Sequence, residues 1–328
     1  MLPELTVARD AWPLKAPFRI SRGVKTEAET VRVELRRGGF VGRGEGTPYA
    51  RYGEGVDQVL GALADLAPAF ARGEPDAALL ARLDAGAARN ALDCALWDLR
   101  AREAGRSVAA LTGLQVPSRL ACAVTISLDE PEAMAAAART VAASPILKVK
   151  LDDREVEARI RAVGEAAPEA RLILDPNESW SLELLSDLQP FLARFRVALI
   201  EQPLPASADH GLAGFRAVAP LCADESVHTR EGLATLRDRY QAVNIKLDKA
   251  GGLTEAAALL RAARELGLGV MTGCMVCSSL GIAPALLLAG ASDLADLDGP
   301  WWLSRDWADG VAMENGWMRP PTPEFWGG

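Results

Sequence analysis

Five charged residues stand at nearly even intervals through the middle of the chain, and each of them ends a short apolar run. They are Lys150, Asp175, Glu201, Asp224 and Lys246, which lie 25, 26, 23 and 22 residues apart in turn. An apolar run that stops at a charge, repeated with room for one helix between copies, is typical of a βα unit. Barrels of such units carry their chemistry at the carboxyl ends of their strands, so the pattern predicts a fold and the active face of that fold.

The rest of the chain is organised around this series. Residues 1 to about 45 alternate as strands do, and residues from about 56 to 113 are alanine-rich and helical. We therefore predict an α/β fold with an α+β capping domain over 1–115, a (β/α)7β TIM-like barrel over 116–300 and a C-terminal tail over 301–328. The first barrel strand is expected at 119–126 and the eighth at 294–298. The tail holds five of the eight tryptophans, which favours its packing onto the capping domain.

The composition excludes several classes of protein. A net charge of -8 argues against a general nucleic-acid binder, and no apolar stretch is long enough for a membrane span. No secretory signal is visible, and an odd, sparse set of cysteines does not indicate a disulfide framework, so we expect a cytoplasmic protein. Because their CxxC spacing lacks the context of a redox helix, we interpret Cys274 and Cys277 as buried thiols. Homo-oligomerisation is left open.

Three lysines of this region have the placement of acid/base groups. Lys148 and Lys150 share one face of their strand, and two ammonium groups this close should lower each other's pKa toward useful basicity. In an eight-stranded ring the second strand lies opposite the sixth, so Lys150 and Lys246 should face each other across the barrel mouth. Lys249 is the rival of Lys246, but only Lys246 directly ends its apolar run.

The three carboxylates between these lysines predict a metal site. Asp175, Glu201 and Asp224 close three consecutive strands, so their side chains should converge, and like charges brought together need a cation. Oxygen ligands without histidine or thiolate favour Mg²⁺, or Mn²⁺, over zinc. Asn177 should support the site, whereas Glu225 should point away from it by strand alternation.

The eighth strand adds a second pair of carboxylates, Asp296 and Asp298, opposite the strand of Glu201. A substrate carboxylate on the metal would place its α-carbon between the two opposed lysines, one removing the α-proton and the other returning a proton on the opposite face. This arrangement predicts racemisation or epimerisation through a metal-stabilised enolate, with the two aspartates holding a free α-ammonium group. The two histidines, His210 and His228, are expected at the surface.

These motifs make the chain similar to a known family. Through "RYGEG", "LKVKLD", "DPNESW", "EQPLP", "CADESVHTR", "VNIKLDKAGGLTEA", "GCMVCSS" and "ADLDGP" it resembles, over nearly its whole length, the muconate-lactonizing subgroup of the enolase superfamily. Within that subgroup it is most similar to the bacterial L-Ala-D/L-Glu (dipeptide) epimerases. Lysine bases combined with Mg²⁺ are the general pattern of the superfamily.

The resemblance implies a role for each part of the series. The acid/base catalysts would be Lys150 and Lys246, with Lys148 as a supporting lysine. One Mg²⁺ per subunit would be bound by Asp175, Glu201 and Asp224. The substrate would be a dipeptide, epimerised at its glutamate α-carbon during recycling of murein peptides, with Asp296 and Asp298 on its ammonium group. A capping-domain loop, "ISRGVKTEA", would close over the barrel, and Arg22 or Lys25 would pair with the glutamate side chain.

Three alternatives remain open at this point. An o-succinylbenzoate synthase or N-acylamino acid racemase would keep the metal and the lysines but would not need Asp296 and Asp298. A Schiff-base lyase would use a barrel lysine such as Lys246 as nucleophile, but it leaves the three carboxylates without a role. A binding protein without activity on the same scaffold leaves every filled catalytic position without a role.

Overall fold

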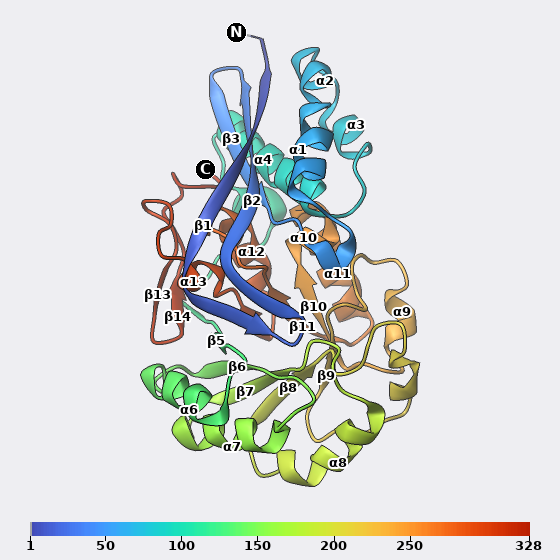
Figure 1. The fold of residues 1–328 in the computed structure, drawn as a ribbon. Helices are drawn as coiled ribbons and strands as arrows, with labels where there is room; N and C mark the ends of the chain where they lie inside the picture. The colour runs from blue at the N-terminus through green and yellow to red at the C-terminus, as the bar shows by residue number, and fades with distance from the viewer. Residues whose placement is uncertain (1) are drawn as a thin grey trace.

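The computed structural model describes residues 2–328, which form two bodies stacked one above the other (Figure 1). The upper body begins with an antiparallel sheet whose strands follow each other in the chain, β1 (Glu4–Ile20), β2 (Gly23–Arg37) and β3 (Phe40–Gly46). A 3-10 turn and five helices complete it, η1 (Ala50–Tyr52), α1 (Val56–Ala64), α2 (Ala67–Ala71), α3 (Asp76–Leu80), α4 (Ala87–Ala104) and α5 (Val108–Thr112). The predicted α+β capping arrangement is confirmed.

Helix α4 packs closely across β3 because that strand presents no side chains to it. Gly42, Gly44 and Gly46 occupy every second position, so all three turn a bare backbone toward the helix. A Cβ atom on Gly44 would collide with the carbonyl oxygen of Ala91 in α4. The sheet and α4 therefore form one unit, from which the β1–β2 turn and η1 reach the barrel (Figure 1).

The lower body is an eight-stranded parallel barrel, as predicted. Neighbouring strands are hydrogen bonded in chain order, β5 (Val124–Ile126), β6 (Ile146–Lys150), β7 (Arg171–Asp175), β8 (Val197–Glu201), β9 (Leu221–Ala223), β10 (Ala242–Lys246), β11 (Gly269–Gly273) and β12 (Leu294–Asp296). Ala123 N donates to Ala295 O over 2.8 Å, which brings the last strand against the first. The connections contain α6 (Pro131–Thr140), α7 (Val156–Ala166), α8 (Leu182–Leu192), the 3-10 turn η2 (Asp209–Leu212), α9 (Leu233–Leu236), α10 (Leu247–Ala250), α11 (Leu253–Glu265) and α12 (Ser279–Ala289).

One inward-facing residue from each strand, or for β5 from the position just before it, fills the lower half of the barrel. This layer consists of Ala123, Ile146, Ile173, Leu199, Cys222, Ala242, Met271 and Leu294. Side chains alternate along a strand, so the next inward position after Ile146 belongs to Lys148 and the one after that to Lys150. The apolar layer thus closes the barrel from below and leaves the charged residues at its carboxyl end.

Three strands differ from the prediction in their extent. The stretch at 119–126 is split into β4 (Leu120–Ala121) and β5, because β4 pairs with the antiparallel strand β14 (Trp317–Arg319) of the tail. Strand β12 ends at Asp296, so Asp298 is the residue ahead of α13 (Gly299–Trp302). Strand β9 ends at Ala223, one residue before Asp224.

The tail contacts both bodies. Its strands β13 (Ala312–Glu314) and β14 form a small sheet with β4 at the barrel. Its last residues reach the capping domain, where Trp326 Nε1 donates to Arg43 O over 2.9 Å and Gly327 N donates to Asp98 Oδ1 over 2.8 Å. The boundaries at 115 and 300 stay predictions.

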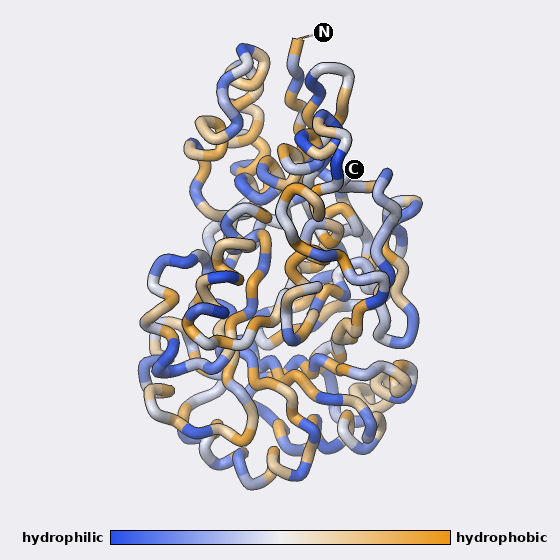
Figure 2. Tube along the Cα trace, turned by 180° about the vertical axis from the view of Figure 1, so that it is seen from behind, coloured by the Kyte–Doolittle hydropathy of each residue, from blue (hydrophilic) through white to orange (hydrophobic). Residues whose placement is uncertain are grey.

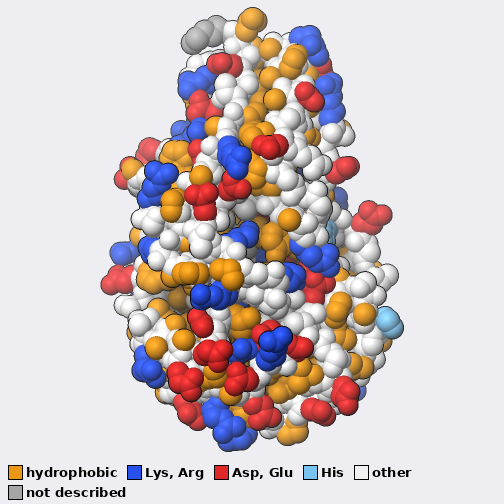
Figure 3. Space-filling view, in the orientation of Figure 1, with side chains coloured by type: hydrophobic (Ala, Val, Ile, Leu, Met, Phe, Trp, Pro, Cys, Tyr) orange, Lys and Arg blue, Asp and Glu red, His pale blue; other side chains and the backbone are white. Residues whose placement is uncertain are grey.

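Hydropathy follows this arrangement. Hydrophobic segments run through the interior of both bodies, and hydrophilic segments lie at the outer turns (Figure 2). Acidic and basic side chains are mixed over the face seen in Figure 3. Within residues 2–328, no helix combines the length and the apolar character needed to cross a membrane.

Candidate active site

A cavity of about 500 Å³ lies between the two bodies, at the carboxyl ends of the barrel strands. The capping domain lines it with Phe18 and Ile20 of β1 and with Tyr52 of η1. The barrel lines it with most of the predicted site residues, among them Lys148, Lys150, Asn177, Asp224, Lys246, Asp296 and Asp298. The active face predicted from the strand ends is therefore the face that the capping domain covers.

The two lysine–aspartate pairs of the charged series lie on either side of β8, the strand that ends in Glu201. Lys150 Nζ on β6 lies 2.5 Å from Asp175 Oδ2 on β7, and Lys246 Nζ on β10 lies 2.7 Å from Asp224 Oδ2 after β9. Each lysine thus pairs with the carboxylate of the next strand toward β8. Because β6 and β10 are four strands apart in a ring of eight, the two lysines stand on opposite walls of the cavity.

Lys148 lines the cavity and lies among three of the carboxylates. Its Nζ atom is 2.7 Å from Glu201 Oε2, 2.7 Å from Asp296 Oδ2 and 3.0 Å from Asp175 Oδ2. Burial alone would lower the pKa of Lys148, but these carboxylates, Asp175 foremost, raise it well above its usual value. The expected lowering of a lysine pKa by its lysine neighbour is therefore wrong at Lys148, because the neighbouring negative charges outweigh that repulsion.

Among the three predicted metal ligands, Glu201 has the fewest partners that offset the cost of burying its negative charge. Asn244 Nδ2 donates to its Oε1 atom over 2.7 Å, but Oε2 accepts no hydrogen bond of good geometry although Lys148 is close. Burial, followed by the charge of Asp175, raises the pKa of Glu201 to about 8. Within residues 2–328 no three acidic, cysteine or histidine side chains stand as a ready-made metal-binding group. In this arrangement the Lys148 ammonium group stands between two of the three predicted ligands, Asp175 and Glu201.

Asp224 is held by two lysines. Lys246 Nζ lies 2.7 Å from its Oδ2 atom, and Lys249 Nζ lies 2.6 Å from its Oδ1 atom. Burial alone would raise the pKa of Asp224, but Lys246 and Lys249 hold it well below its usual value. Lys246 lines the cavity whereas Lys249 is buried outside it. The structure therefore favours Lys246 over its rival as the group that can reach a substrate.

The two aspartates of the eighth strand have separate partners. Asp296 is paired with Lys148, and Asp298 Oδ2 accepts hydrogen bonds from Thr125 N at 2.7 Å and Trp302 Nε1 at 3.2 Å. Burial, followed by the charge of Asp296, raises the pKa of Asp298 to about 6. Both carboxylates line the cavity, as expected of a site for a cation.

Asn177 lies at the cavity, as predicted, next to the lysine of β6. Its Oδ1 atom is 3.4 Å from Lys150 Nζ, and its backbone N–H donates to Asp175 Oδ1 over 3.0 Å. Its φ of 47° is in the left-handed region that asparagine tolerates better than most residues. This turn ends the strand and points the amide back at the charged series.

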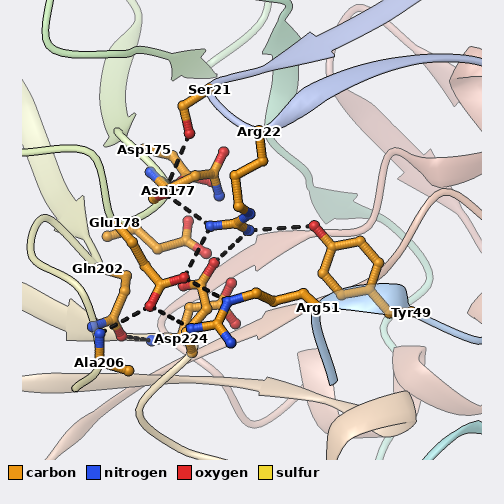
Figure 4. A network of polar contacts seen from close by, with 12 residues as sticks. Ser21, Arg22, Tyr49, Arg51, Asp175, Asn177, Glu178, Gln202, Ala206 and Asp224 are labelled. Carbon is orange, nitrogen blue, oxygen red and sulfur yellow. Dashed lines mark hydrogen bonds and ion pairs between the residues drawn. The ribbon is translucent and has the colours of Figure 1, made fainter. Parts of the chain in front are cut away.

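Arg22, predicted to contact substrate, is part of an ion-pair network that joins the capping domain to the barrel (Figure 4). Its guanidinium lies 2.6 Å from Glu225 Oε1 and 3.1 Å from Glu178 Oε2, and it donates to the Asn177 carbonyl over 2.8 Å. Burial opposes the charge of Arg22, but Glu225 and Tyr49 raise its pKa above the usual value. The network places the turn between β1 and β2 over the cavity.

Lys25, the other predicted contact, also lines the cavity. Its Nζ atom lies 5.2 Å from the centre of the Tyr49 ring, and within residues 2–328 it forms no ion pair. Its charge is therefore available to a ligand.

Several site residues were not found from the sequence, or were misplaced. Glu225 lines the cavity and holds Arg22, so the expectation that it points away is wrong, because β9 has ended before it and strand alternation no longer applies. Asn244 was missed, although its position two residues before Lys246 puts both on one face. Glu178 gave no signal in the sequence, because its partners Arg22 and Arg51 come from the other domain.

Two further expectations need correction. His210 is exposed as expected, but His228 is partly buried, its ring packed edge-on against Tyr52 at 4.5 Å between centroids, and burial lowers its pKa. Four of the cysteines are buried, but Cys274 is partly exposed and lines the cavity, because it lies in the loop that follows β11.

Comparison with known proteins agrees with this architecture. Residues 3–113 match the model of the mandelate racemase/muconate lactonizing enzyme N-terminal domain, and residues 132–324 match the enolase C-terminal domain-like model. The chain belongs to the mandelate racemase/muconate lactonizing enzyme family. The predicted membership of the enolase superfamily is thereby confirmed, and the relatives of this chain are named as epimerases and racemases, which are isomerases.

Two relatives and two solved structures are especially informative. The chain is 48% identical to an L-Ala-D/L-Glu epimerase of Escherichia coli K12 (92% of this chain, 94% of the relative) and 44% identical to an N-acetyl-D-glutamate racemase of a Pseudoalteromonas species (88% and 92%). An Agrobacterium tumefaciens enolase family member with homology to dipeptide epimerases, solved with sodium and L-Ala-L-Glu, has a TM-score of 0.96 at 45% identity (99% and 100%). A dipeptide epimerase of Methylococcus capsulatus, complexed with Mg and L-Arg-D-Lys, has a TM-score of 0.89 at 32% identity (98% and 99%).

Proposed function

We propose that this chain epimerises dipeptides at the α-carbon of their C-terminal residue, with L-Ala-D/L-Glu as the preferred substrate. The observation that carries the proposal is the pair Lys150 and Lys246, which line one cavity from opposite walls. A substrate α-carbon between them presents its hydrogen to one lysine in the L epimer and to the other in the D epimer. One Nζ atom takes the α-proton and the other returns a proton to the opposite face, which inverts the centre.

The carboxylates of Asp175, Glu201 and Asp224 fit a divalent cation. All are fully buried, they are oxygen donors of the kind that Mg²⁺ and Mn²⁺ prefer, and the Oε2 atom of Glu201 has no well-placed hydrogen-bond donor. We propose that these three residues bind one Mg²⁺ per subunit, with Lys148 giving up its contacts to them. A bound cation of this kind would stabilise negative charge that develops on the substrate carboxylate.

Charges at the rim of the cavity suit a glutamate dipeptide. Asp296 and Asp298 would receive the α-ammonium group of the first residue. Lys25 and Arg22 would attract the side-chain carboxylate of the second. A role in recycling murein peptides in the cytoplasm, which the resemblance in sequence implies, is part of the same proposal.

Deuterium exchange at the α-carbon tests this proposal directly. With Mg²⁺ in D₂O, L-Ala-L-Glu should gain deuterium at the glutamate α-carbon and form L-Ala-D-Glu, as followed by NMR. Lys150→Met and Lys246→Met should each abolish epimerisation, and each should spare exchange from only one epimer, because only one base is lost. Loss of exchange from both epimers in both variants would contradict the two-base arrangement, and no exchange in the unaltered protein would refute the function.

Racemisation of N-acyl amino acids is a second candidate, favoured by the N-acetyl-D-glutamate racemase at 44% identity. An N-acyl group brings no ammonium to Asp296 and Asp298. Asp298→Asn should therefore slow L-Ala-L-Glu turnover more than turnover of N-acetyl-L-glutamate. A higher kcat/KM for N-acetyl- or N-succinyl amino acids than for L-Ala-L-Glu would replace the dipeptide assignment with this one.

A further inference from the structure

Asp224 differs from the other two proposed metal ligands in how its main chain is held. Asp175 and Glu201 are the last residues of β7 and β8, and both have partners in the strand ladder. Strand β9 ends at Ala223, and its pairing with β10 stops at Ala223 and Val243. The sheet therefore does not fix the carbonyl group of Asp224.

The Asp224 carbonyl oxygen accepts a hydrogen bond from Val227 N over 3.2 Å, and Lys249 provides a second donor to it. Its Nζ atom lies 2.5 Å from the Asp224 carbonyl oxygen, 2.6 Å from Asp224 Oδ1 and 3.0 Å from the Asn244 carbonyl oxygen. A lysine ammonium group has three N–H donors, so all of them have acceptors here. The side chain is 1% exposed and does not line the cavity. Lys249 thus has no donor left for a substrate.

The placement of Lys249 follows from the absence of a loop after β10. Helix α10 begins at Leu247, directly after Lys246, and Gly251 with a φ of 80° ends it. This sharp change of direction sends Lys246 into the cavity and Lys249 behind Asp224. The two lysines therefore reach the same carboxylate from opposite sides, Lys246 at Oδ2 and Lys249 at Oδ1.

We propose that Lys249 is a positioning residue, which fixes the main chain and one carboxylate oxygen of Asp224 so that the other oxygen faces the cavity. Gln202 contributes the opposite restraint, since its Oε1 atom accepts from Asp224 N over 2.9 Å. Asp224 Oδ2 is then the oxygen presented to Lys246 and to a bound cation. This inference deepens the proposed function and rests on it for the identity of the cation.

Mn²⁺ affinity, measured by electron paramagnetic resonance, separates this role from a simple effect of charge. Removing a positive charge should by itself tighten cation binding. If Lys249 positions Asp224, both Lys249→Met, which loses the charge, and Lys249→Arg, which keeps it but changes the contacts, should weaken Mn²⁺ binding by roughly tenfold or more. Binding by a folded Lys249→Met protein that equals or exceeds that of the unaltered protein would overturn the proposal.

Kinetics from the two epimers give an independent readout. A positioning residue acts on both proton transfers, so Lys249→Met should reduce the rates of α-proton exchange in D₂O from L-Ala-L-Glu and from L-Ala-D-Glu by the same factor, whereas Lys246→Met should abolish exchange from one epimer only. A loss confined to one epimer would make Lys249 a base and overturn the proposal. If neither Lys249 variant folds, a crystal structure of the unaltered protein with Mn²⁺ decides, because Lys249 Nζ must stay on Asp224 Oδ1 and not turn into the cavity. Failure of the unaltered protein to bind Mn²⁺ would instead refute the proposed metal site.

Discussion

Replacing Lys148 with methionine should destabilise the protein strongly when no divalent cation is present. The ammonium group neutralises three buried carboxylates at 2.7–3.0 Å, those of Asp175, Glu201 and Asp296. Removal of one partner from a buried ion pair costs about 3–5 kcal/mol, because the remaining charge is left uncompensated. For a chain of this size that loss corresponds to a melting temperature lowered by roughly 4–7 °C. Lys25→Met is the matched control, since Lys25 lines the same cavity but forms no ion pair within residues 2–328, and it should change stability by under about 0.5 kcal/mol.

Mg²⁺ should reverse much of this loss. In the variant Glu201 Oε2 loses its ammonium neighbour and Asp175 Oδ2 keeps only Lys150, so a cation no longer competes with Lys148 for these oxygens. At a hundredfold excess over its dissociation constant a ligand stabilises the folded state by about 2.7 kcal/mol. Thermal unfolding in EDTA and in Mg²⁺ therefore should show a larger cation effect for Lys148→Met than for the unaltered protein. Equal effects of Mg²⁺ on both proteins, or an unchanged melting temperature in EDTA, would refute this reasoning.

Predictions also follow for three features that take no part in proton transfer, namely the contact of β3 with α4, the buried Glu45 and the partly exposed Cys274. Gly44→Ala should lower the free energy of unfolding, measured with denaturant, by about 1–3 kcal/mol, because the new methyl group collides with α4. Gly61→Ala lies in open space on helix α1 and should raise that free energy by up to about 1 kcal/mol. Equal effects of the two substitutions would contradict the close packing of β3 on α4. Burial raises the pKa of Glu45, bonded to Ser278, from 4.5 to about 7, so its contribution to stability is complete below pH 4.5 and is lost as pH rises through 7. Glu45→Gln should remove roughly 3 kcal/mol from the loss of unfolding free energy between pH 4.5 and 7. A pH–stability curve that is the same in the variant would contradict this role of Glu45. Cys274 should be the thiol of the native protein that reacts with a disulfide reagent, at a rate slowed by substrate, and rapid reaction of two or more thiols would disprove this.

The fold and the charged series could be predicted because both follow from local periodicity. Apolar runs that end in charges identify strands and their carboxyl ends, and the even spacing gives the ring order that places Lys150 opposite Lys246. The strand period also puts Lys148 on the face of Lys150. These inferences need only neighbouring positions along the chain.

The pairing of those charges could not be predicted in the same way. Lys148 was expected to act on Lys150, but its actual neighbours are carboxylates from three other strands, and these reverse the direction of its pKa shift. Glu225 and Asp298 lie just beyond the ends of strands, where the two-residue alternation no longer fixes a direction. The acidic partners of Arg22 lie more than 150 residues away in the chain, so its ion pairs depend on how the two bodies dock.

The raised lysine pKa in this structure is compatible with a lysine base, because its cause is removable. Burial alone would lower the pKa of Lys246, and the charge of Asp224 is what raises it. The Oδ2 atom of Asp224 cannot hold Lys246 and serve as a cation ligand at full strength at the same time, whereas Oδ1 remains with Lys249. If Asp224 turned Oδ2 to a cation, Lys246 would keep its burial but lose the negative charge that compensates it, and its pKa would fall. If Asp224 binds a cation as proposed, metal binding and the creation of a free base would be one event, and addition of Mg²⁺ to the protein in weakly buffered solution should release protons. Release of none would show that Asp224 does not couple the two.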